Sequence, residues 1–343
     1  MLNITECARL SDLMIVTDIK LWNDKYLVRS NDKIIALGRE DFDPVWELAL
    51  EGRTKIDLGM IFLFAGRIFL FSCDTDSDNF NIFCIDENGN MLWRKQSEYR
   101  PRDINSITSF NEELIYLGYN SNSTDHHIIA LNFEEGTVIE KARFQLNVQY
   151  LHNINDRLYL SGASGLFKAE GPSLEHWQNI TDIYIDSVMS HKDGMLFIAE
   201  STDAYKLYEF KGTEEGLVSL GEFSLDSSDR GFMEPLFIAD KYMVKLAGKK
   251  RGVACLTFGP EGELWHRFDG EYTGRQMAGV NNIYLLFYGV DTDFNDKLCL
   301  LDLATGEDLA DVKYDGMLYG IKAVNNILFV RGTEGLVIYQ VKK

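Results

Sequence analysis

The sequence predicts an all-β fold assembled from one short unit that is repeated along the chain. A turn of Asn, Asp or Gly followed by an apolar strand recurs eight times, and the copies are on average about 43 residues apart. Evidence for helices is weak throughout. A period of this length, with several strands in each repeat, is typical of a β-propeller. The eight turns are Asn23-Asp24, Ala65-Gly66, Asn111-Glu112, Asn155-Asp156, Lys192-Asp193, Ala239-Asp240, Asn281-Asn282 and Asn325-Asn326.

The residues at these turns agree with the period. Asn, Asp and Gly tolerate the positive φ angles that two-residue hairpin turns require. The unit over 280–309 is the clearest: an Asn-Asn turn, an apolar strand at 283–287, an acidic loop, a second apolar strand at 297–303, and a Thr-Gly turn into another strand. We therefore expect four strands in each unit.

The last unit ends after three strands, of which the third covers 336–341. The segment Leu2 to Cys7 is the natural candidate for the missing fourth strand, because its pairing would remove the exposed edge between the first and last blades. The sequence thus predicts a single β-propeller domain over 1–343, with eight four-stranded blades and a ring closed by the N-terminal strand. Seven blades is the alternative, and the fifth unit, with the shortest spacing, is the one in doubt.

The turn between the third and fourth strands resembles the signature of the quinoprotein (PQQ-like) propellers, in which a strand ends in a pattern like Ala-x-Asp-x-x-Thr-Gly-x-x-x-Trp. The resemblance is degenerate and spans the chain, so it implies a fold and not an activity. It implies that Trp46, Trp93, Trp177 and Trp265 pack between adjacent blades. The closest matches are Leu301-Asp302-Leu303-Ala304-Thr305-Gly306, Asp86-Glu87-Asn88-Gly89-Asn90-Met91-Leu92-Trp93, Asn132-Phe133-Glu134-Glu135-Gly136 and Pro260-Glu261-Gly262-Glu263-Leu264-Trp265.

Departures from that family argue against a quinone site. The quinone-dependent members are exported and carry adjacent cysteines near the cofactor. Here no secretory signal is visible over 1–7, and no two of the five cysteines are adjacent. The His and Trp-Asp marks of WD-type propellers are also missing. We expect no PQQ or other cofactor, reduced thiols and a cytoplasmic location.

The net charge of −19 comes from 53 acidic and 34 basic residues. An acidic field of this size repels nucleic acid and anionic membranes and favours cationic partners, although simple solubility is the plainer explanation. No segment approaches the ~20 apolar residues of a membrane helix. The expected partner is a basic protein, with no nucleic acid and no membrane.

In a propeller, the loops between second and third strands emerge on the same face as the links between blades. Four such loops are long here, and they would bring carboxylates and aromatic rings to one rim, suited to a cationic protein surface. The alternative, that loops are polar anyway, stays open. The predicted partner-binding residues are Asp74, Asp76, Asp78, Asp125, Glu200, Asp203, Asp291, Asp293 and Asp296, with Phe80, Tyr119, Tyr205 and Phe294 as aromatic anchors.

No metal site or catalytic group is expected. Asp74 to Asn79 and Asp291 to Asp296 alternate carboxylates as the first half of a calcium loop does, but neither has a suitable acid at its twelfth position. His126 and His127 would point opposite ways on an extended strand, so they rarely share one ion.

Two classes of function follow. The first is a non-enzymatic propeller that binds a basic protein through an acidic loop face. Its most specific form is a cytosolic immunity protein or antitoxin that blocks a basic toxin; a general scaffold is the broader form. The alternative is a hydrolase or lyase with its site in the central funnel of the propeller, which a requirement for a cation would favour.

Overall fold

A computed structural model of the protein describes residues 2–13, 15–30, 32–50, 54–55, 61–74, 80–101, 104–119, 125–171, 174–191, 194–200, 204–212, 216–224, 236–238, 242–246, 253–257, 263–268 and 271–342. These residues form β-strands and one short 3₁₀ helix, η1 (Ile104–Ser106). Along the described ranges, no helix is long and apolar enough to span a membrane. The chain divides into two compact units, described separately: unit 1 covers Met1–Val16, Arg39–Asp43 and Gly221–Lys343, and unit 2 covers Thr17–Gly38 and Pro44–Leu220.

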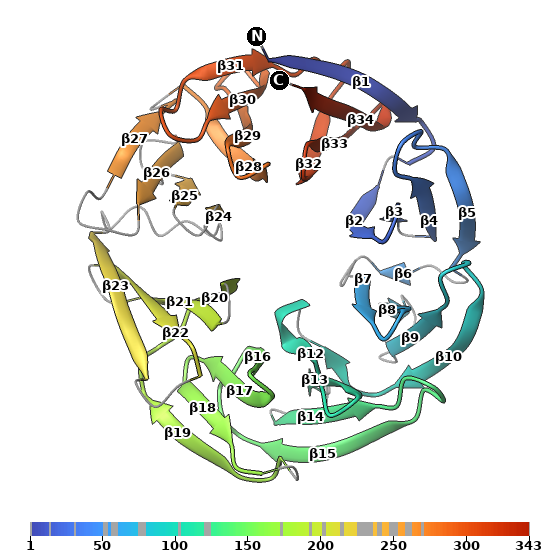
Figure 1. The fold of residues 1–343 in the computed structure, drawn as a ribbon, viewed down its shortest axis with the longest axis vertical. Helices are drawn as coiled ribbons and strands as arrows, with labels where there is room; N and C mark the ends of the chain where they lie inside the picture. Colours follow the sequence, from blue (N-terminus) through green and yellow to red (C-terminus); the bar gives the residue numbers. More distant parts are fainter. Residues whose placement is uncertain are drawn as a thin grey trace. The chain divides into compact units, whose positions relative to one another are not determined.

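Unit 2 holds five antiparallel sheets in its described residues (Figure 1). In two of them the first strand is split into a short outlying piece (β6 or β11) and a longer one (β7 or β12), both paired with the same second strand. The sheets are β2 (Val16–Trp22), β3 (Lys25–Ser30), β4 (Lys33–Gly38), β5 (Pro44–Ala49); β6 (Thr54–Lys55), β7 (Ile61–Phe64), β8 (Arg67–Asp74), β9 (Phe80–Ile85), β10 (Met91–Ser97); β11 (Arg100–Pro101), β12 (Ile107–Phe110), β13 (Glu113–Tyr119), β14 (His126–Leu131), β15 (Val138–Phe144); β16 (Tyr150–Ile154), β17 (Arg157–Gly162), β18 (Gly165–Ala169), β19 (Trp177–Thr181); and β20 (Ser187–His191), β21 (Gly194–Glu200), β22 (Ala204–Phe210), β23 (Leu217–Ser224).

Unit 1 holds three four-stranded antiparallel sheets in its described residues. In the last sheet, strands from the two ends of the chain pair: Asn3 lies opposite Lys342 and Leu10 opposite Leu336. The predicted N-terminal fourth strand is therefore present, and it runs a little further than Leu2 to Cys7. The sheets are β24 (Leu236–Ile238), β25 (Tyr242–Leu246), β26 (Val253–Thr257), β27 (Glu263–Arg267); β28 (Thr273–Val280), β29 (Tyr284–Val290), β30 (Asp296–Asp302), β31 (Asp308–Asp311); and β32 (Leu318–Val324), β33 (Ile327–Gly332), β34 (Gly335–Lys342), β1 (Asn3–Leu10).

Among the described residues, the turns that set the predicted period join first to second strands. Six of the eight lie in described residues, and each has a residue with positive φ, for example Asn281 (50°) and Asn282 (56°). The other two, at Lys192-Asp193 and Ala239-Asp240, lie outside the described residues. Two successive residues with positive φ give the turn the same twist as the flanking strands. Because Asn tolerates positive φ, this explains why Asn is frequent in these turns.

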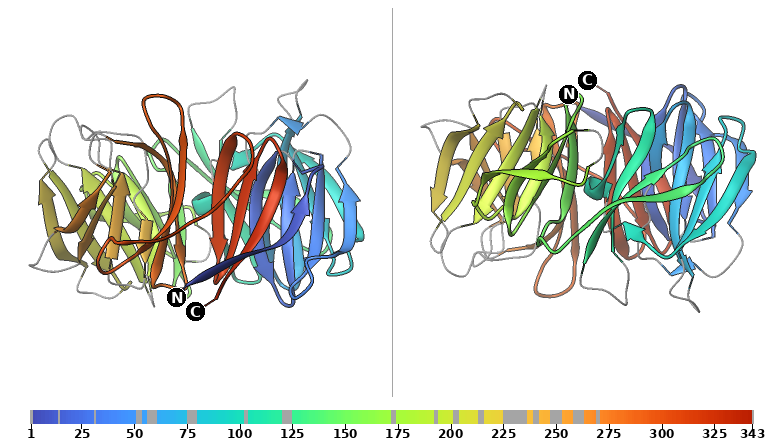
Figure 2. Two further views of the ribbon diagram at one scale, coloured as in Figure 1. Left: turned by 90° about the horizontal axis from the view of Figure 1, so that it is seen from above. Right: turned by 90° about the horizontal axis from the view of Figure 1, so that it is seen from below.

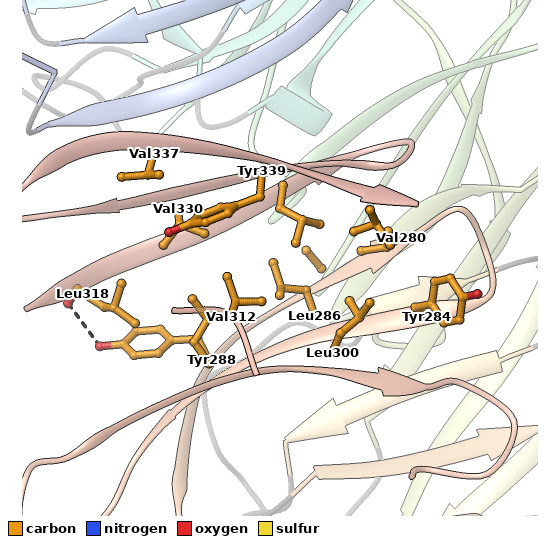
Figure 3. Packing of buried hydrophobic residues seen from close by; sticks show 14 of the residues in the cluster. Val280, Tyr284, Leu286, Tyr288, Leu300, Val312, Leu318, Val330, Val337 and Tyr339 are labelled. Carbon is orange, nitrogen blue, oxygen red and sulfur yellow. Dashed lines mark hydrogen bonds between the residues drawn. The ribbon is translucent and has the colours of Figure 1, made fainter. Parts of the chain in front are cut away.

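The core lies between neighbouring sheets within each unit. Second and third strands are buried on both faces, and β29 is buried along its whole length. In unit 1, one cluster joins the β28–β31 sheet to the sheet of β32, β33, β34 and β1, and it includes Leu286, Leu300 and Val330 (Figure 3). The Tyr288 hydroxyl donates to the Leu318 carbonyl across this contact, at 3.1 Å.

Three tryptophans on fourth strands pack against the next sheet of the same unit. The indole of Trp265 donates to the Leu303 carbonyl at 2.9 Å and covers Gly306, where an added Cβ would lie 2.6 Å from the ring. Trp46 covers Gly89, and Trp93 covers Gly136, in the same way. The predicted packing of these tryptophans between adjacent sheets is thus found, and each partner is the glycine of the Thr-Gly-like turn in the following repeat.

Trp177 differs from the other three. Its indole donates to the Leu174 carbonyl, on the link between β18 and β19, at 2.9 Å. Its ring lies against Phe144 of the preceding sheet, with ring centroids 6.2 Å apart. It still packs between sheets, but toward the preceding repeat.

Candidate functional site

Within the described part of the chain, the predicted partner-binding residues lie at the ends of second and third strands or in the loop that joins them. Asp76, Asp78 and Asp203 lie outside the described residues. Asp74, Glu200 and Tyr205 lie at described strand ends, but their side chains are not among the described groups. The side chains that the structure describes are Phe80, Tyr119 and Asp125 in unit 2 and Asp291, Asp293, Phe294 and Asp296 in unit 1.

Two of these side chains are not surface groups. Phe80 is buried against Phe71 and Tyr116, so the expectation of an aromatic anchor at this position is wrong: β9 begins at Phe80 and carries the ring into the core. Asp125 is also buried, and its carboxylate is paired with the guanidinium of Arg143. That ion pair holds the pKa of Asp125 below its usual value. The Asp125 carboxylate therefore bonds within unit 2 and not to a partner.

Beside this pair lies a second polar group on the same sheet. The Tyr99 hydroxyl donates to Glu140 Oε2 at 2.6 Å, and His127 Nδ1 lies 3.2 Å from Glu140 Oε1. The hydrogen bond to Glu140 raises the pKa of Tyr99 to about 12 and lowers that of Glu140. Tyr119 stacks under the Arg100 guanidinium, 5.6 Å from its ring centroid. These interactions are internal to unit 2.

The loop between β29 and β30 is a five-residue turn held by Asp291. Its Oδ1 accepts the N–H groups of Asp293 and Asn295, both at 2.8 Å, and its Oδ2 accepts the Asn295 side-chain amide at 2.8 Å. Asp291 N–H donates to the Asn295 carbonyl, and Phe294 N–H donates to the Asp291 carbonyl. The Asp291 carboxylate therefore builds the turn, and these bonds lower its pKa.

Replacing Asp291 by alanine is expected to lower the melting temperature at pH 7, because three hydrogen bonds of the turn are lost. A depressed carboxyl pKa gives a contribution that is present above the unfolded pKa and lost as the pH falls through the folded pKa. The difference between wild type and D291A should therefore shrink below pH 4. Differential scanning calorimetry at pH 3 to 7 measures it, and Asp293→Ala, whose carboxylate makes none of the turn's three bonds to Asp291, is the control. A difference that persists unchanged at pH 3 contradicts the role given to Asp291.

The link between β31 and β32, residues 312–317, is fixed beside this turn. Met317 N–H donates to Thr333 Oγ1 at 3.1 Å, and Thr333 N–H donates back to the Met317 carbonyl at 2.9 Å. Leu318 N–H donates to Asp296 Oδ2 at 3.3 Å. Asp296 thus ties the start of β32 to the start of β30, and the loops of two neighbouring sheets form one surface, here called the loop end of unit 1: residues 291–296, 312–319 and 332–335.

Large apolar side chains are exposed at this loop end. Phe294 is 84% exposed, Met317 64% and Tyr319 48%. Ile15, on the link between β1 and β2, is 49% exposed. Ile15 adjoins this surface because the neighbouring Val16 carbonyl accepts a hydrogen bond from Arg331, whose guanidinium lies beside Gly320. Exposed apolar groups gathered in one place mark an interaction surface more than scattered ones do.

The charged groups around these apolar side chains are mainly acidic. Asp293, Asp315 and Glu334 are exposed, while Lys313 is the one base on the link 312–317. Figure 2 shows the β29–β30 loop standing out at the end of unit 1 away from the two termini. The sequence predicted Phe294 and Asp293 at this surface. It did not predict Met317, Tyr319 and Ile15, although links between repeats were expected on this same face.

Within the described ranges, no three His, Cys, Asp or Glu side chains lie close enough to hold a metal ion. The predicted half calcium loop at Asp291 uses its first carboxylate for the turn itself.

Comparison with known proteins defines the class through the fold. No protein-family model matches the sequence, and no curated protein matches it. Among solved structures, BamB from Moraxella catarrhalis superposes with a TM-score of 0.64 at 13% identity over 98% of each chain. The WD40 domain of SCAP from fission yeast gives 0.60 at 11% identity, over 99% of this chain and 98% of that one. A catalytically inactive virginiamycin B lyase from Staphylococcus aureus with quinupristin gives 0.50 at 13% identity over 100% of both.

These likenesses show the fold alone, since the identities are low. The chain has the all-β fold of the propeller proteins, built from repeated four-stranded antiparallel sheets, and the predicted fold-level resemblance is confirmed.

Proposed function

We propose that the protein is a non-enzymatic β-propeller that binds a basic protein partner through the loop end of unit 1. The observation that carries the proposal is the group of exposed apolar side chains, Phe294, Met317 and Tyr319, among acidic loops. Aromatic and methionine side chains are enriched at the centres of protein interfaces, and charged rims steer the approach of a partner.

The sign of the charge selects the partner. The chain carries a net charge of −19, and Asp293, Asp315 and Glu334 are exposed around the apolar side chains. A basic surface gains attraction at long range and apolar burial on contact. In its most specific form the partner is a basic toxin, and this protein is the cytosolic immunity protein or antitoxin that covers it.

The proposal includes a propeller of eight blades whose ring is closed by β1. Its support is the pairing of β1 with β34 and the eight sheets in the described residues. A closed ring removes the sheet edges that would otherwise pair with other chains, and it gives the loop end a rigid base.

Reversing the loop charges tests the proposal. The whole protein, immobilised as wild type or as Asp293→Lys/Asp315→Lys/Glu334→Lys, is incubated with the native lysate at low and at high salt. We expect wild type to retain one basic protein at low salt, and the triple variant to retain at least tenfold less, because charge reversal at an interface slows association and adds repulsion.

The matched control is Glu134→Lys/Glu135→Lys/Glu307→Lys, which changes the net charge equally on exposed turns between third and fourth strands. Its retention should fall much less than that of the first variant. Equal losses in both triple variants would show that only the overall charge matters, and an empty wild-type bait at both salts would overturn the proposed function.

A further inference from the structure

We propose that Phe294 is a projecting anchor that inserts into an apolar pocket, rimmed by Lys or Arg, on the basic protein partner. This inference rests on the proposed function and names how the partner is held. Phe294 lies at the tip of the β29–β30 turn and is 84% exposed, the highest exposure among the large apolar side chains of the described residues.

A second turn in the same chain has the same hydrogen bonds but a glycine at this position. Asp86 to Asn90 forms the same five-residue turn as Asp291 to Asn295. Asp86 Oδ1 accepts two backbone N–H groups at 2.9 and 2.8 Å, and its Oδ2 accepts the Asn90 amide at 2.9 Å. The backbone bonds that close the turn, from Asp86 N–H to Asn90 and from Gly89 N–H to Asp86, also correspond.

The two turns differ at the fourth position. Gly89 has φ +83° there, and Phe294 has φ +65°. Glycine adopts positive φ without steric penalty, whereas a bulky side chain in this region is an outlier. The chain thus places a phenylalanine where the turn itself favours glycine.

Folding gains little from this choice. The Phe294 ring is almost fully in solvent, and its backbone N–H makes the same bond that Gly89 makes. A strained residue with an exposed apolar ring is the kind of local conflict that occurs at functional sites. Burial of the ring in a partner would explain both the positive φ of Phe294 and the exposure of its side chain.

The geometry also gives the shape of the partner's site. The turn is pre-organised by the bonds to Asp291, so the ring loses little freedom on binding. The β29–β30 hairpin stands out from its sheet (Figure 2), and Phe294 is at its tip, so the complementary surface is a pocket. Asp293 is adjacent and exposed, which places basic groups at the rim of that pocket.

Phe294→Gly separates this role from a structural one. The variant should melt about 2 °C higher than wild type, because it relieves the positive-φ strain. The same variant should bind the basic protein retained by the wild-type bait at least about 20-fold more weakly, as expected for a central aromatic anchor. Phe294→Trp keeps an aromatic ring and should remain within a few-fold of wild type. Ile283→Ala, which trims an exposed apolar side chain at the opposite end of β29, should leave binding unchanged.

The experiment distinguishes failure of the Phe294 anchor from failure of the proposed function. Binding that is lost in the acidic triple variant but kept in F294G overturns the anchor and leaves the proposed function standing. Failure of the wild-type bait to retain any protein overturns both. A photo-crosslinking phenylalanine analogue at position 294 supplies a second test: its crosslink should lie in an apolar pocket of the retained protein beside Lys or Arg, and a crosslink on a flat or acidic surface contradicts the inference.

Discussion

Replacing Trp265 by alanine is expected to lower the free energy of unfolding by about 3–5 kcal/mol, the usual range for removing a buried tryptophan. Trp265 is 8% exposed, its Nε1 donates to the Leu303 carbonyl, and its ring covers Gly306. The variant loses apolar burial, leaves a cavity between two sheets and removes a hydrogen bond. Urea unfolding followed by circular dichroism measures the change.

Gly306→Ala should also be strongly destabilising, for a related reason. Gly306 has φ +73°, and the new Cβ would lie 2.6 Å from the Trp265 ring, so the indole must move. Gly66→Ala is the control, because Gly66 has φ +68° with no atom near its Cβ position and so isolates the backbone strain of about 1 kcal/mol.

The double variant W265A/G306A tests whether the effects of the two substitutions on the free energy of unfolding are coupled. Removing the indole makes room for the new methyl group, so the double variant should be less destabilised than the sum of the single variants. Strict additivity within about 0.5 kcal/mol would show that the contact between ring and glycine does not carry the effect.

Acid should destabilise the protein through His152. This side chain is buried on β16, with Nε2 2.9 Å from Ser161 Oγ and its ring against Phe197, and burial lowers its pKa to about 3. Between pH 6.5 and 3 the unfolded chain binds a proton at this residue that the folded protein does not. Stability therefore falls as the pH falls, by up to about 1.4 kcal/mol per pH unit below 6.5 from this residue alone.

His152→Gln should remove that part of the pH dependence, because glutamine keeps a hydrogen-bonding group toward Ser161 and does not titrate. At pH 7 the variant is expected to be less stable than wild type through imperfect packing, and near pH 4.5 the gap should close or reverse by about 2–3 kcal/mol. Denaturant unfolding at several pH values measures the difference, with the exposed His176→Gln as control. A gap that is the same at every pH is the result that contradicts a neutral, buried His152.

Local features of the fold could be predicted because they depend on local chemistry. The Asn-rich turns follow from the need for positive φ, and the tryptophans near the Thr-Gly-like turns follow from the repeat pattern. The sequence also indicated that the N-terminal segment completes the last sheet. It did not indicate that Trp177 turns toward the preceding repeat, because that depends on which side chain, here Phe144, happens to lie opposite.

The candidate site was harder to predict because it depends on tertiary contacts. Asp125 appeared as one more loop carboxylate, and its partner Arg143 comes from the next strand. Phe80 appeared to belong to a loop, but β9 begins at this residue. The positive φ of Phe294 could not be foreseen, since turn statistics favour glycine or asparagine there. The exposure of Met317 and Tyr319 is set by the way the link 312–317 is tied to Thr333.

The pairing of Asn3 with Lys342 has a consequence for the order in which the molecule is made. During translation at about 5–20 residues per second, β1 leaves the ribosome long before β34 exists, so it stays without its partner strand for roughly 15 to 70 s. Most side chains of β1 remain exposed even in the folded state, and Arg9 and Glu6 form an ion pair along it. A polar strand of this kind has little tendency to associate with other nascent chains while it is unpaired, because it exposes little apolar surface.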